Sequence, residues 1–121
     1  MAIDHVTLDV QDIAVSRKFY AQALRPLGYE ARAESGESVG FGDDRGVDFW
    51  IARRGEPTTT HVALAAPSRD AVEQFHEAAL AAGGRDNGEP GVRTHYHDNY
   101  YAAFAIDPDG NNIEAVYHRP E

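Results

Sequence analysis

Two histidines and one glutamate in this chain could together bind a divalent metal ion. His5 and His61 each begin an alternating stretch that predicts a β-strand, and Glu114 lies in a third such stretch near the C-terminus. Two imidazoles and one carboxylate bind divalent transition metals and leave coordination positions open for substrate or water. The sequence therefore predicts a metal site wherever the fold brings these three side chains together.

An internal repeat gives the two histidines equivalent positions. The stretch 5–28 matches the stretch 61–84 without a gap, and the identities fall at structurally sensible places: His5/His61, Val6/Val62, Leu8/Leu64, Phe19/Phe75, Ala23/Ala79, Leu24/Leu80 and Gly28/Gly84. Two copies of one unit pack about a pseudo-two-fold axis, and equivalent residues then converge on that axis. We therefore expect both histidines to lie near the boundary between the two halves.

Each half predicts a strand, a helix and then three short strands. Strands are expected at 3–10, 30–33, 38–41 and 47–52 in the first half, and at 60–66, 84–87, 100–106 and 112–117 in the second. Helices follow the predicted N-caps Asp12 and Ser68. One such unit buries too little apolar surface to be stable alone. We predict a single α+β domain over 1–121, in which two βαβββ modules, about 1–54 and 59–119, form a curved mixed sheet with helices on its outer face.

The alternation also predicts which side chains share the concave face of that sheet. In the first strand Val6 and Leu8 face the helices, so His5 and Thr7 face the opposite side, as His61 does in the second half. The same parity places Glu114 on the concave face, between two apolar neighbours. Trp50 falls there as well, because the residues on either side of it are apolar, and we expect it to form a wall for a substrate.

The segment 93–101 is a second candidate for chemistry. It holds two of the six histidines and three of the six tyrosines of the chain. We interpret it as a loop at the rim of the site, in which His97 or His95 acts as an acid or base, since imidazole titrates near neutral pH. Tyr100 would add an aromatic wall for the substrate. A loop rich in tyrosine also suits a dimer contact, and that alternative stays open. His76 and His118 are expected to be solvated surface residues.

Composition excludes several classes of function. The net charge is −9 and there is no cysteine, so nucleic-acid binding, disulfides and thiolate chemistry are not expected. No run approaches the roughly 20 apolar residues of a membrane span, and the first residues do not read as a secretion signal. We expect a cytoplasmic protein that acts on a small molecule without contacting membranes.

The paired layout resembles the vicinal oxygen chelate superfamily, which includes glyoxalase I, fosfomycin-resistance enzymes, bleomycin-binding proteins and extradiol dioxygenases. The segments that resemble it are 4–8, 16–20, 27–28, 60–63 and 107–114. The resemblance implies that His5, His61 and Glu114 are metal ligands for Mn, Fe, Ni, Co or Zn. It implies lyase, isomerase, transferase or dioxygenase chemistry and a homodimer. Where modules are exchanged between chains, one site would take His5 from one chain and the other two ligands from its partner.

The chain departs from the subfamilies at two positions. Trp50 stands where glyoxalase I has its fourth, glutamate ligand, which argues against true glyoxalase I activity. Phe104 stands where fosfomycin-resistance enzymes and extradiol dioxygenases typically have a tyrosine, although Thr7 resembles the fosfomycin enzymes and suggests contact with substrate. The alternative function is a non-catalytic protein of the bleomycin-binding kind, whose acidic, aromatic cup would hold a cationic or aromatic ligand.

Overall fold

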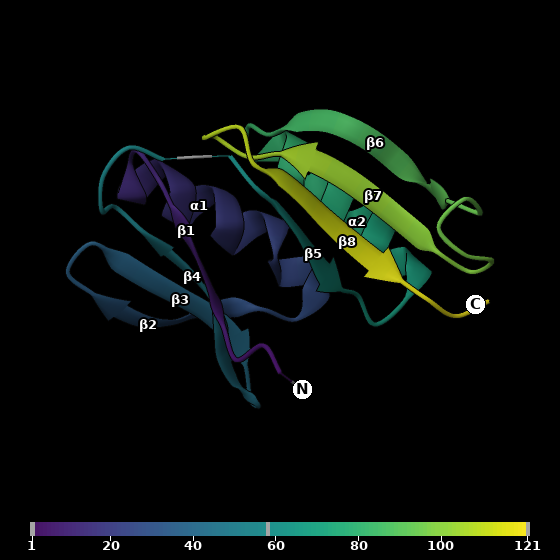
Figure 1. The fold of residues 1–121 in the computed structure, drawn as a ribbon, viewed down its shortest axis with the longest axis horizontal. Coiled ribbons are helices and arrows are strands. Elements are labelled where there is room, and N and C mark those ends of the chain that lie inside the picture. The colour runs from purple at the N-terminus through teal and green to yellow at the C-terminus, as the bar shows by residue number, and fades with distance from the viewer. Residues whose placement is uncertain (1, 58, 121) are drawn as a thin grey trace.

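The computed structural model describes residues 2–57 and 59–120 and consists of two βαβββ modules (Figure 1). The first comprises β1 (Val6–Asp9), α1 (Ile13–Ala23), the short 3-10 helix η1 (Arg25–Leu27), β2 (Glu30–Ser35), β3 (Ser38–Asp43) and β4 (Gly46–Ala52). The second comprises β5 (His61–Ala65), α2 (Arg69–Ala81), β6 (Arg85–Val92), β7 (Tyr101–Ile106) and β8 (Asn112–Tyr117). The predicted fold class and element order are confirmed.

Each module contributes one four-stranded mixed sheet, with strand order β1-β4-β3-β2 in the first and β5-β8-β7-β6 in the second. The first strand of each module pairs in parallel with the last, while the other pairs are antiparallel. Consequently β1 and β5 stand at the ends of their sheets, and each has one hydrogen-bonded neighbour in the described chain. β1 is shorter than predicted and begins at Val6, so His5 precedes it.

The helices form where the sequence supplies caps and an apolar stripe. The Asp12 carboxylate accepts hydrogen bonds from the backbone N–H groups of Ala14 and Val15, at 3.0 and 3.1 Å, and Ser68 caps α2 in the same way. Each helix presents one apolar face to its sheet, with Phe19 and Phe75 at equivalent places in the core. No helix in the described residues is long and apolar enough to cross a membrane.

One hydrophobic core runs through both modules, between the helices and the sheets. In β4, Phe49 and Ile51 are almost fully buried in this core, whereas Trp50 between them points to the other face of the sheet. Helix α2 packs on β7 and β8, and it also contacts α1 (Figure 1). The helices therefore cover one face of each sheet and leave the opposite face for a site.

A buried polar cluster joins the second module to the first. Asp107 and Asn111, in the turn between β7 and β8, are 4% and 0% exposed. The Asp107 carboxylate accepts hydrogen bonds from the Tyr20 hydroxyl of α1 and from the Asn111 side chain and backbone. Asp109 in the same turn accepts from the backbone N–H of Gln11, at 3.0 Å. Burial, and then the neighbouring Asp107 charge, hold the pKa of Tyr20 well above its usual value.

Within the second module, His76 on α2 is hydrogen-bonded to Asp86 on β6, with 2.9 Å between Nε2 and Oδ1. His76 is 9% exposed, which corrects its expected place on the solvated surface. Its sequence signal was weak because one imidazole on a helix fits either environment.

The Asp86→Asn variant tests how much the hydrogen bond between His76 and Asp86 stabilises the fold. The hydrogen bond from His76, reinforced by the Gly88 backbone N–H, lowers the pKa of Asp86. A lowered carboxylate pKa stabilises the fold above the unfolded-state value of about 4, and the effect is lost as the pH falls through the lowered value. We expect the variant to have a lower Tm than the wild type near pH 6 and an equal Tm in strong acid. A Tm difference that persists unchanged into strong acid would contradict this account.

Candidate functional site

Two of the three predicted metal ligands lie together in the second module, on the neighbouring strands β5 and β8. Parallel pairing of β5 with β8 places His61 opposite Asn112 and Ala63 opposite Glu114. The His61 Nε2 and Glu114 Oε1 atoms are 2.7 Å apart. The Glu114 side chain is 1% exposed, whereas that of His61 is half exposed. The pair thus combines a fixed, buried carboxylate with an imidazole that solvent or a ligand can reach.

Tyr100 holds the other oxygen of the same carboxylate. Its hydroxyl donates a hydrogen bond to Glu114 Oε2, so both carboxylate oxygens have partners. Burial, and then this hydrogen bond, raise the pKa of Tyr100 far above neutrality, so the hydroxyl keeps its proton and donates it. The sequence predicted Tyr100 as an aromatic wall for a substrate, but its contact with Glu114 was not foreseen.

Phe104 and Arg93 extend this face of the second sheet. The Phe104 ring lies 6.1 Å from the His61 ring, and the Arg93 guanidinium lies over the Phe104 ring, 5.3 Å from its centroid. Arg93 also donates to the backbone carbonyls of Glu89, Gly91 and Ala102, at 2.7 to 3.0 Å. These contacts fix the irregular part of β6 beside the site.

His5 does not join His61 and Glu114 within one chain. It is exposed, and its Nδ1 atom lies 2.7 Å from the Asp4 carboxylate. In residues 2–57 and 59–120, no three His, Cys, Asp or Glu side chains are close enough to hold a metal ion. A single chain therefore assembles two of the three predicted ligands, and the three-ligand site stays a prediction.

Trp50 and Thr7 are neighbours on the first sheet, where β1 pairs with β4. The indole of Trp50 lies against Gly40, at which an added Cβ would stand 2.9 Å from the ring atoms Cε2 and Cζ2. A side chain at position 40 would therefore displace the ring, and glycine lets it lie close to the sheet. Trp50 is half-buried here and faces away from the core, as the alternation in the sequence predicts.

The rim segment folds as a hairpin between β6 and β7, closed by the Arg93 backbone N–H on the Tyr100 carbonyl, at 2.6 Å. The His95 ring lies against Tyr96 in a tilted arrangement, and the His97 and Tyr100 rings meet edge to face. His118, just after β8, is exposed as expected and also lies against His97, with 2.7 Å between His97 Nε2 and His118 Nδ1. Sequence reasoning missed His118 because the two histidines are far apart along the chain.

The family profile of the Glyoxalase/Bleomycin resistance protein/Dioxygenase superfamily matches residues 2–115, which is nearly the whole chain. The chain belongs to this superfamily. The resemblance seen in its sequence is thereby confirmed, and the paired modules and helix-covered sheets are those of other superfamily members.

Individual proteins are similar to this chain over nearly its whole length. A glyoxalase/bleomycin resistance protein from Albidiferax ferrireducens T118 is 32% identical, with a TM-score of 0.87 over 97% of this chain and 99% of that one. The protein YqjT of Bacillus subtilis is 29% identical over 93% of this chain and 95% of its own length. A family enzyme from Burkholderia phytofirmans PsJN is 18% identical, with a TM-score of 0.73 over 98% of this chain and all of that one, and shows the fold alone.

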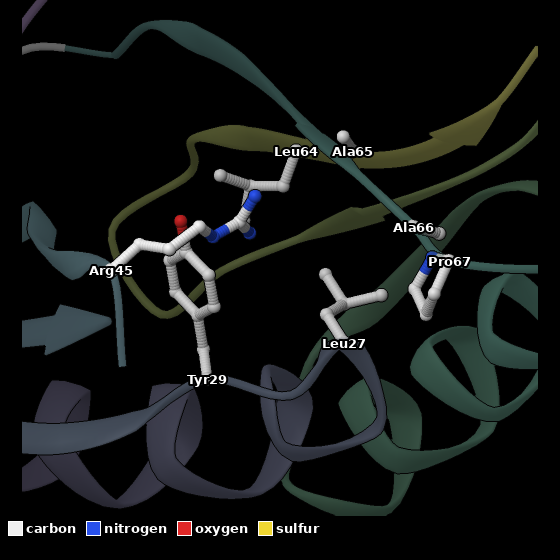
Figure 2. A pocket seen from close by; sticks show the side chains of 7 residues that line it. All are labelled: Leu27, Tyr29, Arg45, Leu64, Ala65, Ala66 and Pro67. Carbon is white, nitrogen blue, oxygen red and sulfur yellow. The ribbon is translucent and has the colours of Figure 1, made fainter. Parts of the chain in front are cut away.

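A separate cavity of about 330 Å³ lies between the modules, away from these side chains (Figure 2). Leu64, Ala65, Ala66 and Pro67 line it from the end of β5, and Leu27, Tyr29 and Arg45 line it from the first module. The Tyr29 hydroxyl donates to Asp48, and burial followed by that bond raises the pKa of Tyr29 to about 12. None of the predicted superfamily ligands lines this cavity, so the candidate site remains the His61–Glu114 face.

Proposed function

We propose that this protein is a metal-dependent enzyme of its superfamily that acts on a small oxygen-rich substrate. In this proposal His61 and Glu114 of one chain and His5 of a second copy hold a divalent ion. The close approach of His61 and Glu114 carries the proposal, because a half-exposed imidazole and a buried carboxylate face one point. Exposed His5 beside a strand with a free edge suits the second copy's contribution.

The donor set fits a divalent ion. Neutral imidazole and carboxylate are ligands of Mn, Fe, Ni, Co and Zn, and two nitrogens with one oxygen leave sites open for substrate oxygens. When bound, the ion supplies Lewis acidity to those oxygens. Tyr100 fixes the carboxylate by donating to Oε2, so that Oε1 stays directed at His61. A carboxylate held in this way is expected to bind a metal ion more tightly than a mobile carboxylate would.

Other residues of this chain would bind the substrate and move protons. Trp50 and Thr7 present an apolar surface and a hydroxyl on the first sheet. His97 is a better proton-transfer group than His95, because its ring contacts Tyr100, which in turn contacts Glu114. Trp50 in place of a glutamate leaves no carboxylate there to move a proton, which argues against glyoxalase I chemistry.

Mixed dimers test whether the site is shared between chains. The His5→Ala and Glu114→Gln chains are each expressed and purified alone as parents. In a separate preparation the two chains are co-expressed with different tags, so that the mixed dimer can be isolated. If the site is shared, the mixed dimer contains one intact site, formed by His5 of the Glu114→Gln chain and by His61 and Glu114 of the other. Both chains also carry His118→Ala, so that the neighbouring pair of His97 and His118 cannot contribute bound metal. We expect no tightly bound metal in either parent and one ion per mixed dimer.

The parents serve as matched controls, because each mixed chain carries one of the same two substitutions. A mixed dimer that holds no metal, or a His5→Ala parent that retains the wild-type amount, would overturn the shared site. Wild-type protein that binds no divalent ion at all would overturn metal dependence itself.

A non-catalytic binding protein is the second candidate. Two observations favour it: a single chain brings only two of the predicted ligands together in its described residues, and its net charge of −9 suits a cationic ligand. Trp50, the one tryptophan of the chain, reports on such binding. Quenching of its fluorescence by a cationic aromatic compound, in metal-free protein and with micromolar affinity, would support this function over the enzyme.

A further inference from the structure

One close pair of histidines links the rim hairpin, which carries His97, to His118 in the segment after β8. We propose that His97 and His118 form a second metal site, which binds a divalent ion of the nickel, copper or zinc type. Their facing nitrogens, His97 Nε2 and His118 Nδ1, are 2.7 Å apart, and their rings stack with centroids 4.8 Å apart and planes 23° apart. This site stands on its own geometry and does not depend on the proposed enzyme function.

Two imidazole nitrogens this close need a hydrogen atom between them. At this distance one nitrogen must carry a proton and the other must accept it, since two bare lone pairs repel. A divalent ion can take the place of that proton and bind both lone pairs. Imidazole is a good ligand for nickel, copper and zinc, and affinity for nitrogen sites is highest for copper. Both residues are exposed, so water can fill the remaining coordination positions.

The surrounding rings hold the two histidines in place. Tyr100 meets both rings edge-on, at 5.3 Å from His97 and 5.1 Å from His118. The backbone hydrogen bond from Arg93 to Tyr100 closes the hairpin that carries His97. His118 follows directly after β8, whose residue Tyr117 pairs with Tyr101. Each histidine therefore projects from a fixed backbone, which lowers the entropy cost of chelation.

The second site touches the first through Tyr100. The hydroxyl of Tyr100 bonds to Glu114, while its ring lies against the histidine pair. An ion between His97 and His118 would tie the hairpin to the segment after β8 and limit the movement of Tyr100. One further consequence rests on the proposed function: the bound ion would withdraw His97 from proton transfer and so inhibit the enzyme.

Copper titration in a His61→Ala background isolates the second site from the first. His61 is half exposed, so its replacement is compatible with folding. We expect one Cu²⁺ per chain, with an electron paramagnetic resonance spectrum that shows two imidazole nitrogens. Adding His118→Ala should weaken Cu²⁺ binding on the order of 10²-fold, because one point of a two-point attachment is lost. Adding His97→Ala should do the same.

His95→Ala is the matched control, since His95 lies in the same hairpin but contacts Tyr96 instead of facing His118. We expect it to leave Cu²⁺ affinity unchanged. Absence of Cu²⁺ binding in the His61→Ala protein, or binding that His118→Ala does not weaken, would overturn the proposal. The two histidines would then share a hydrogen bond without binding metal. If circular dichroism shows that His118→Ala is misfolded, His118→Asn decides the matter by the same criterion. Metal dependence at His61 and Glu114 is unaffected by either outcome.

Discussion

The Glu114→Gln protein is expected to fold normally and to lose the divalent ion that the wild type retains. Glutamine keeps the volume of the buried side chain and can still accept the hydrogen bond from Tyr100. It lacks the negative charge that makes a carboxylate a metal ligand. Loss of a hydrogen-bonded partner around a ligand already weakens metal binding by about 10- to 100-fold, so loss of the ligand itself should cost at least about 100-fold.

Metal content after gentle purification, with a titration of the same protein, provides the measurement. Glu77→Gln, on an exposed part of α2, is the matched control and should keep the full wild-type metal content. Any activity found for the wild type should disappear together with the metal. Retention of tightly bound ion by folded Glu114→Gln in a His118→Ala background, which lacks the His97–His118 pair, would contradict the assignment of Glu114 as a ligand.

The Asp107→Ala protein is expected to be destabilised by about 3 kcal/mol or more, because several buried donors lose one acceptor. These donors are the Tyr20 hydroxyl, the Asn111 side-chain amide and two backbone N–H groups of the turn. Tyr20 and Asn111 are both fully buried, so water cannot replace the lost carboxylate without a rearrangement. Urea unfolding gives the change in the free energy of unfolding.

Asp43→Ala provides the comparison, because Asp43 precedes the equivalent turn of the first module. Its carboxylate is only partly buried and bonds to the exposed side chain of Arg45, so its removal should cost far less. Equal destabilisation by both substitutions would show that the buried cluster does not join the modules in the way its hydrogen bonds suggest.

The fold could be predicted from the sequence because the signals in the two halves repeat. His5 to Gly28 matches His61 to Gly84, so each weak alternating or helical pattern is supported by a second copy. The least accurate predictions concern strand ends. The strand predicted for 3–10 begins at Val6, and the strand predicted for 84–87 continues to Val92 through an irregular pairing with β7. Strand ends depend on hydrogen bonds to neighbours, which residue types do not specify.

The candidate site was predictable only where it follows strand parity. Parity placed Glu114 and His61 on one face, and β5–β8 pairing then brought them together. Parity could not reveal that Tyr100, just before β7, donates a hydrogen bond to Glu114, or that His118 contacts His97. Both contacts depend on the path of the long connection between β6 and β7, whose counterpart between β2 and β3 is a tight turn. His5 is a different case, since its distance from the other ligands depends on how copies associate.

The turn between β7 and β8 has a consequence for the integrity of the chain. Asp107 and Asp109 accept hydrogen bonds from α1 and from the segment before it, and one hydrophobic core passes through both modules. The covalent connection near Gly55 is thus redundant once folding is complete. A protease that cuts this exposed stretch would leave two fragments that stay associated, because each supplies half of the shared core.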